Sequence, residues 1–166
     1  MGLDRVQVEG VDIVHDLDVT PYPIPSDSFD EIHARHVIEH VDSIGAFMAE
    51  IHRIGAHGAR VHVSTPHYTW SGSWRDPTHK WHLATTTFQY FESGHLSGYY
   101  TDTARFEIVS IHVTLLSLWR YLGLQWLVNL PNRFPATKKL RRFWEEYLCF
   151  VVRAKEMRAV LRVIKA

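Results

Sequence analysis

Strand-like and helix-like patterns of apolar residues follow one another along the first part of the chain. Val11–Val14 is a short run rich in β-branched residues, Phe29–Ala34 is a second strand-like run, and Arg60–Ser64 alternates between polar and apolar positions. Between the last two runs, apolar residues recur at spacings of three and four, which predicts a helix with one apolar face. These residues are Ile44, Phe47, Met48, Ile51 and Ile54. We therefore expect strand, loop, strand, helix and strand in that order.

The rest of the chain continues with strands and helices of its own. A β-rich run covers Phe106–Thr114, an apolar helical region follows it to Leu130, Leu140–Val152 predicts another helix, and Met157–Ile164 predicts a last strand. Parallel strands need such helical crossovers, which lie on the faces of the sheet. With 46% hydrophobic residues in 166, the pattern predicts one α/β domain over residues 1–166.

Composition narrows the classes of partner and compartment. Lysine and arginine total 18, as do aspartate and glutamate, so no net charge favours nucleic acid as a partner. The apolar run Val113–Leu130 is interrupted by Arg120, Gly123 and Gln125, so we expect no membrane span. The single Cys149 cannot form an internal disulfide, and no signal peptide is recognisable, which favours a cytoplasmic location.

Short motifs occur in a defined order along the chain. They are Asp16-Leu17, the loop Pro21–Pro25, Phe29-Asp30, Ile38-Glu39-His40, Arg53-Ile54 with Gly58, and Asp76-Pro77-Thr78-His79. In this order they resemble the second half of the nucleotide-binding core of class I S-adenosylmethionine-dependent methyltransferases. The resemblance implies a truncated Rossmann-like methyltransferase fold, an α/β fold whose mixed sheet has about five strands and helices on both faces. The sheet would be mixed because the family's last strand is antiparallel.

The resemblance also implies which residues face the cofactor, S-adenosylmethionine. Asp16 and Leu17 would lie beside the adenine, while Ala34, Arg35 and His36 would line its amino-acid end. Two of these residues have a structural alternative. Asp16 could instead cap a loop, and His36 could be a strand-end residue that is hydrogen-bonded to backbone.

Acceptor-side candidates gather in the aromatic segment that follows the third expected strand. His79 is the candidate general base if an acceptor hydroxyl or amine needs deprotonating, and His36 is a second catalytic candidate. Asp76, Trp74 and Trp81 join His79 as candidate substrate-binding residues. For the aromatic side chains, packing in a core or lid is the alternative.

The segment before Val11 departs from the family pattern. Residues 1–10 contain no Gly-x-Gly, whereas the family holds the carboxylate and ribose of its cofactor on a glycine-rich first turn. We therefore expect a protein that by ancestry transfers methyl groups to a small-molecule or glycan-like acceptor, in an impaired or inactive form. One alternative is a dimeric binding module that keeps only the acceptor-side pocket. Another is a divalent-metal protein, although the family resemblance itself implies no metal ligand. Its ligands would be His67, Asp76, His79 and His82.

The same departure predicts an exposed edge in the sheet. In the family's strand order, the missing first strand separates the equivalents of Val11–Val14 and Glu31–Ala34. Either Arg5–Val14 slides in to pair with the second of these strands, or a second copy of the chain covers an apolar edge. We expect a homodimer, because symmetric pairs are the usual outcome for such edges.

Overall fold

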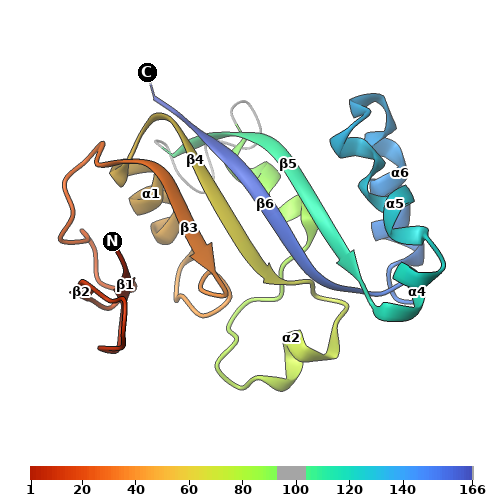
Figure 1. The fold of residues 1–166 in the computed structure, drawn as a ribbon, viewed down its shortest axis with the longest axis horizontal. Helices are drawn as coiled ribbons and strands as arrows, with labels where there is room; N and C mark the ends of the chain where they lie inside the picture. The colour runs from red at the N-terminus through yellow and green to blue at the C-terminus, as the bar shows by residue number, and fades with distance from the viewer. Residues whose placement is uncertain (93–103, 166) are drawn as a thin grey trace.

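The computed structural model describes residues 1–92 and 104–165, and its centre is a four-stranded mixed sheet (Figure 1). The strand order is β3-β4-β6-β5. The strands are β3 (Phe29–Arg35), β4 (Gly55–Pro66), β5 (Arg105–Leu115) and β6 (Ala154–Ile164). β3 and β4 are parallel, while β6 runs antiparallel to both β4 and β5. The predicted mixed α/β fold is therefore confirmed.

The alternation of side chains along the two central strands produces the main core. On β4, Ala59, Val61 and Val63 are buried, whereas Arg60 and His62 between them point to the opposite face. β6 buries Met157, Ala159, Leu161 and Val163 in the same way. One face of the sheet is therefore apolar and covered, and the other carries polar side chains that reach solvent.

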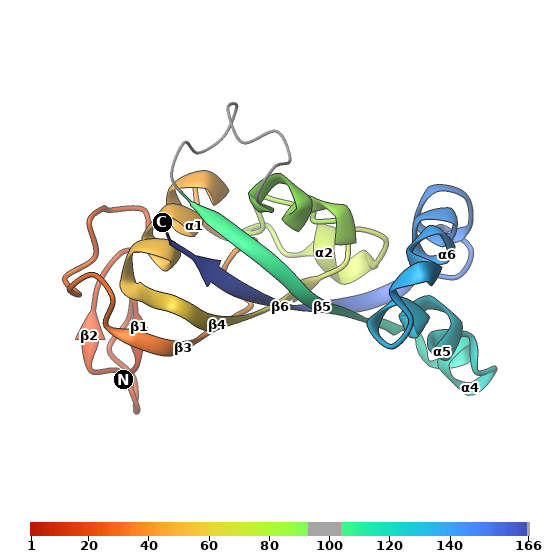
Figure 2. The same ribbon diagram turned by 90° about the horizontal axis from the view of Figure 1, so that it is seen from above.

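Helix α1 (Ile44–Ile54) covers the apolar face because its apolar residues lie on one stripe. Its buried apolar residues are Phe47, Met48, Ile51 and Ile54, four of the five expected from the sequence. The Ser43 hydroxyl caps the helix by accepting the Ala46 N–H at 3.2 Å. The 3₁₀ helix η1 (Thr85–Phe91) lies on the same face (Figure 2), and short helix α2 (Ser71–Arg75) stands in the loop after β4.

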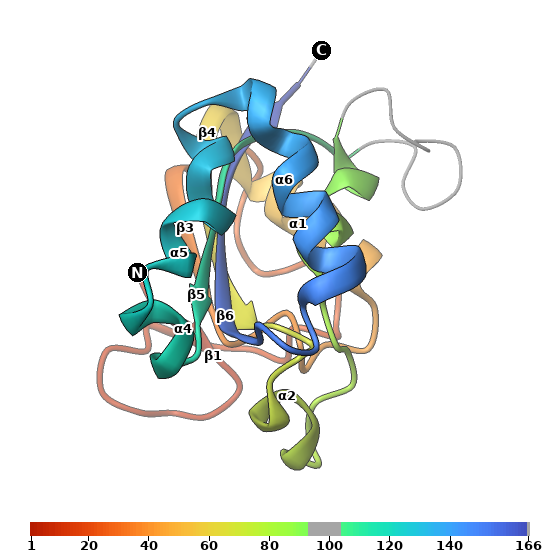
Figure 3. The same ribbon diagram turned by 90° about the vertical axis from the view of Figure 1, so that its right-hand side faces the viewer.

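The remaining helices lie along the β5 edge of the sheet (Figure 3). They are α4 (Ser117–Tyr121), α5 (Leu124–Asn129), η2 (Leu130–Asn132), η3 (Pro135–Thr137), α6 (Lys138–Phe143) and the π turn η4 (Trp144–Leu148). Gly123, with φ of +75°, allows the chain to turn between α4 and α5. The Asn129 amide accepts the Val113 N–H at 2.7 Å and donates to the Val113 carbonyl at 2.8 Å. Side chains from this region thereby form hydrogen bonds with backbone N–H and carbonyl groups on the free edge of β5.

The N-terminal strands differ from the prediction. β2 (Ile13–Val14) pairs in parallel with β1 (Leu3–Asp4) as a separate two-stranded sheet, so Val11–Val14 does not join the main sheet as the expected fifth strand. The Gly2 carbonyl accepts the Asp12 and Ile13 N–H groups at 2.8 and 3.1 Å, which fixes this local pairing.

The prediction that the sheet has an exposed apolar edge is also wrong. β3 is an edge strand of the main sheet, but Asp30, Glu31, His33 and Arg35 are all exposed on it. Charged side chains on an edge strand discourage further pairing, so the physical reason given for a homodimer does not apply to β3. The homodimer itself stays a prediction. In the described residues, no helix has the length and apolar character required to cross a membrane.

Candidate active site

The loops after β3 and β4 meet at one end of the sheet (Figure 1). Because these two strands are parallel, their carboxyl ends share this edge, which is where open α/β sheets bind ligands. His36 directly follows β3 and has a left-handed backbone, with φ of +51°. Its N–H donates to the Ser64 carbonyl at 2.9 Å, so the backbone hydrogen bond of the structural alternative is present. This turn directs the His36 ring toward Glu39 at 3.2 Å.

Glu39 is the most unusual group in this region. Its side chain is only 1% exposed, and Oε1 lies 3.2 Å from Nδ1 of His36. Oε2 is buried without a hydrogen-bond partner among the described residues. A buried carboxylate oxygen in this condition is costly and needs a partner. Glu39 is therefore placed to hold a polar group of a ligand or a cation.

Two imidazoles face this carboxylate. The ring centroids of His40 and His79 are 4.7 Å apart, and one ligand atom from each ring lies within 4.8 Å of the other and of a Glu39 oxygen. Nδ1 of His79 donates to the Ser73 carbonyl at 2.8 Å, and Nδ1 of His40 lies 3.2 Å from the Thr78 carbonyl. Because a carbonyl only accepts, these contacts place a proton on Nδ1 of each ring and leave the Nε2 lone pair free in the neutral form. The three side chains can therefore bind a cation or accept protons.

Asp76 orders the loop beside these histidines. Its Oδ1 accepts the Thr78 hydroxyl at 2.6 Å and the Thr78 N–H at 2.9 Å. These hydrogen bonds lower the pKa of Asp76, with a smaller contribution from nearby His79. Oδ2 of Asp76 lies 3.8 Å from Nε2 of His79. Of the predicted substrate-binding residues, Asp76 and His79 are thus brought together.

The two predicted tryptophans are anchored in the loops by their indole N–H groups. Trp81 donates to the Val41 carbonyl at 2.8 Å, which joins the loops after β3 and β4. Trp74 donates to the Tyr68 carbonyl at 2.6 Å and stacks on His82 with ring centroids 3.5 Å apart. Trp74 is 61% exposed and Trp81 is 41% exposed. Both side chains are thus partly accessible to solvent, and their substrate-binding role stays a prediction.

An ion-pair group joins the predicted adenine-side loop to the same edge. Lys80 pairs with both Asp18 and Asp42, and Oδ1 of Asp18 accepts the Asp42 N–H at 2.7 Å. Asp16 and Leu17 directly precede this contact. Oδ1 of Asp16 accepts the Asp18 N–H at 3.1 Å, as the loop-cap alternative describes. The structure therefore places both parts of the predicted cofactor site at one end of the molecule, with Ala34 buried and Arg35 exposed on β3.

The predicted metal set of four residues is not brought together. His67 is fully buried, and its Nε2 lies 3.3 Å from Glu145. His82 contacts Ser73 through Nδ1 at 3.0 Å and stacks on Trp74. Only Asp76 and His79 stay adjacent, and the metal-competent groups in the described residues do not include this set. The hypothesis of this particular site is wrong because His67 and His82 each contact other partners.

Two residues of the site, Glu39 and His40, had no functional role predicted from the sequence. Both belong to the motif Ile38-Glu39-His40, which supported the resemblance. The fully buried Ile38 beside Glu39 is the local signal that this loop turns inward.

Comparison with known proteins places the fold in a family. Residues 2–110 match a family model described as a methyltransferase domain, so the chain belongs to this family. No curated protein sequence matches the chain.

Solved structures support the same fold. The [4+2]-cyclase SpnF matches 92% of the chain with 20% identity and a TM-score of 0.50, and the chain spans only 55% of SpnF. A protein from Bacillus halodurans whose description is that of a methyltransferase matches 92% of the chain and 71% of its own length, with 13% identity and a TM-score of 0.55. An S-adenosylmethionine-dependent methyltransferase from Mesorhizobium loti matches 89% and 67%, with 14% identity and a TM-score of 0.50. At these identities the likeness establishes the Rossmann-like methyltransferase fold alone.

Proposed function

We propose that this chain binds a hydroxyl-bearing small-molecule or glycan-like acceptor between the loops after β3 and β4, and that residues 1–166 alone are impaired in methyl transfer. The observation that supports the acceptor site is the buried Glu39 carboxyl group, which lies near the imidazoles of His40 and His79 and whose Oε2 has no hydrogen-bond partner among the described residues. A ligand hydroxyl that donates to this oxygen would satisfy it. Trp74 and Trp81 offer the exposed ring faces that commonly bind sugars and other flat or apolar groups.

His79 is the residue we assign as general base. Its Nδ1–H donates to the Ser73 carbonyl, so its Nε2 is the atom that accepts a proton from an acceptor hydroxyl. The Asp76 carboxylate, 3.8 Å from Nε2, stabilises the imidazolium that results. In this family, S-adenosylmethionine supplies the methyl group when it is bound.

The residues present fit that cofactor only in part. Asp16 and Leu17 lie at the same end of the molecule as Ala34, Arg35 and His36. No Gly-x-Gly occurs in residues 1–28, ahead of β3, whereas the family holds the ribose and carboxylate of the cofactor on backbone N–H groups of such a turn. Methyl transfer also depends on holding donor and acceptor in near-attack geometry, which an incomplete cofactor site does not achieve.

The cytoplasmic location stays a prediction.

Titration calorimetry with S-adenosylmethionine and S-adenosylhomocysteine tests this proposal. We expect the 166-residue protein to give no binding heat up to about 1 mM ligand, which corresponds to a binding free energy weaker than about −4 kcal/mol. Binding in the micromolar range would contradict the impaired state. In that event Asp16→Ala would weaken binding if Asp16 contacts the adenine, while Asp30→Ala, an exposed acid on β3, is the matched control.

A further inference from the structure

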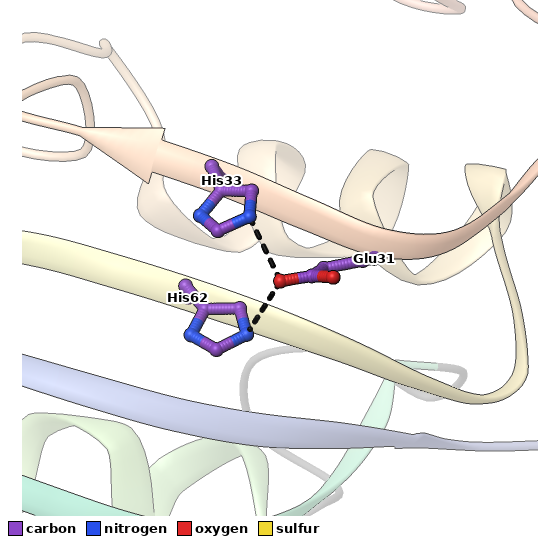
Figure 4. A group of neighbouring side chains, drawn as sticks. All are labelled: Glu31, His33 and His62. Atoms are coloured by element: carbon purple, nitrogen blue, oxygen red, sulfur yellow. Dashed lines mark ion pairs between the residues drawn. The ribbon is translucent and has the colours of Figure 1, made fainter.

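Three metal-ligating side chains converge on the polar face of the sheet, away from the loops described above. Glu31 and His33 lie on β3 and His62 lies on β4 (Figure 4). The register of these parallel strands places His33 directly beside His62. Glu31 precedes His33 by two residues and therefore lies on the same face. The sheet itself thus holds the three side chains together.

Two of the three distances between the ligand atoms match the spacing of ligands around a metal ion. Oε1 of Glu31 lies 2.9 Å from Nε2 of His33 and 3.2 Å from Nε2 of His62, as the dashed lines in Figure 4 mark. The imidazoles are stacked, with centroids 4.7 Å apart and planes inclined by 13°. A tetrahedral zinc ion with bonds of about 2.0–2.1 Å holds its ligand atoms about 3.3 Å apart. The two distances from Glu31 already match this spacing, and rotation of the imidazoles out of their stack would direct both Nε2 lone pairs at one ion.

We propose that Glu31, His33 and His62 bind a divalent transition-metal ion, with zinc as the best fit. Two imidazoles and one carboxylate form a ligand set that suits zinc and disfavours magnesium and calcium, which take oxygen ligands. The side chains are 58%, 46% and 34% exposed, so the ion has an entry path and a fourth position open to water.

The residues around the proposed metal site indicate which kind of ligand suits the fourth coordination position. The depression that His33 and His62 line is also lined by Arg35, His112, Glu156 and Arg158. Arg158 pairs with Glu156 at 2.7 Å, so the Arg35 guanidinium is the group that, next to a divalent cation, favours an anionic ligand such as a carboxylate or phosphate group at the fourth position. The three ligands differ from those of the proposed acceptor site, Glu39, His40 and His79, although His36, which contacts Glu39, also lines this depression.

Zinc binding to tag-free, chelator-treated protein tests the proposal. We expect wild-type protein to bind zinc at this site and His33→Gln/His62→Gln to lose more than about 100-fold in affinity, because even outer ligand partners are worth 10–100-fold. His57→Gln, which removes an exposed imidazole on β4 outside this depression, is the matched control and should bind normally. Cobalt bound to wild-type protein should give the visible absorption of a four-coordinate site, and the double variant should not.

A second pair of variants separates the two metal-competent groups. His40→Gln/His79→Gln should keep the zinc that the first double variant loses. Zinc should also raise the melting temperature of wild-type protein and leave that of His33→Gln/His62→Gln unchanged, since a ligand stabilises only the state that binds it. Because His33 and His62 are partly exposed, both metal-free proteins should have similar circular dichroism spectra and melting temperatures. Equal zinc affinity in wild type and His33→Gln/His62→Gln, or no zinc binding by wild type at about 1 mM, would overturn the proposal.

Discussion

Glu145→Ala is expected to lower the free energy of unfolding by about 3–5 kcal/mol, the range for breaking a buried charged network. Glu145 is 7% exposed and lies in the π turn η4. Its Oε1 accepts the Thr85 N–H at 2.7 Å and lies 3.3 Å from Nε2 of His67, and its Oε2 accepts the Thr85 hydroxyl. One carboxylate thus joins the C-terminal helical region, the end of β4 and the start of η1.

The protonation of this network explains the size of the effect. Burial alone would raise the pKa of the Glu145 carboxyl, but the hydrogen bonds from His67 and Thr85 outweigh it and lower the pKa below its ordinary value. The ring of His67 can donate only from Nε2, because the Thr69 N–H donates to its Nδ1 at 3.3 Å. Alanine would leave the His67 donor and both Thr85 donors buried and unsatisfied.

Urea unfolding at pH 7 measures this loss. Glu146→Ala is the matched control, since Glu146 is exposed and pairs with the exposed Arg142, and it should change stability by less than about 0.5 kcal/mol. Glu145→Gln keeps one acceptor oxygen and should fall between the two. If Glu145→Ala and Glu146→Ala unfold at the same urea concentration, Glu145 does not hold these elements together.

Periodicity predicted the parts of the fold in which one face is buried. The spacing of Phe47, Met48, Ile51 and Ile54 and the alternation of Arg60–Ser64 both indicated which face meets the core, and the structure agrees. Val11–Val14 has an equally strand-like composition, yet its residues Ile13 and Val14 pair with Leu3–Asp4 and not with a strand of the main sheet. Composition does not say which partner a short strand has, because that depends on the chain before and after it.

The candidate sites show the same limit. The sequence predicted that His79 and Asp76 lie together because three positions separate them on one loop. In the structure, Nε2 of His79 lies 3.8 Å from Oδ2 of Asp76. Glu31 and His33 have the two-residue spacing of one strand face, but only the register of β3 on β4 brings His62 to them. Glu39 is an acid that sequence alone would leave at the surface. Its burial follows from the closure of two loops that are distant in sequence, since its carbonyl accepts the Lys80 and Trp81 N–H groups.

Arg53→Ala is expected to lower the free energy of unfolding by about 2–3 kcal/mol, since it removes one partner of a largely buried ion pair. Nε and Nη2 of Arg53 each donate to Glu50 at 2.8 Å. The same guanidinium donates to the carbonyls of Ile24 and Tyr22 at 2.8 and 3.1 Å. Arg53 therefore fastens the proline-rich loop to α1, and Arg53→Lys should restore little of the loss because an ammonium cannot make this planar set of contacts.

The pH dependence of this effect has a definite sign. The hydrogen bond from Arg53, opposed by burial and aided by the Tyr22 N–H, lowers the pKa of Glu50 from its ordinary value of 4.5. The stabilisation is therefore complete above about pH 4.5 and is lost as the pH falls through the lower pKa of the folded state. In Arg53→Ala, burial is no longer opposed by the guanidinium, so the loss of stability at low pH that comes from this ion pair should disappear.

The stability difference between wild type and Arg53→Ala, measured by urea unfolding, should shrink from neutral pH to about pH 3. Arg142→Ala, which breaks an exposed pair, should differ little from wild type at either pH. An Arg53→Ala difference that is the same at both pH values would show that the guanidinium acts through packing on the loop rather than through the Glu50 charge.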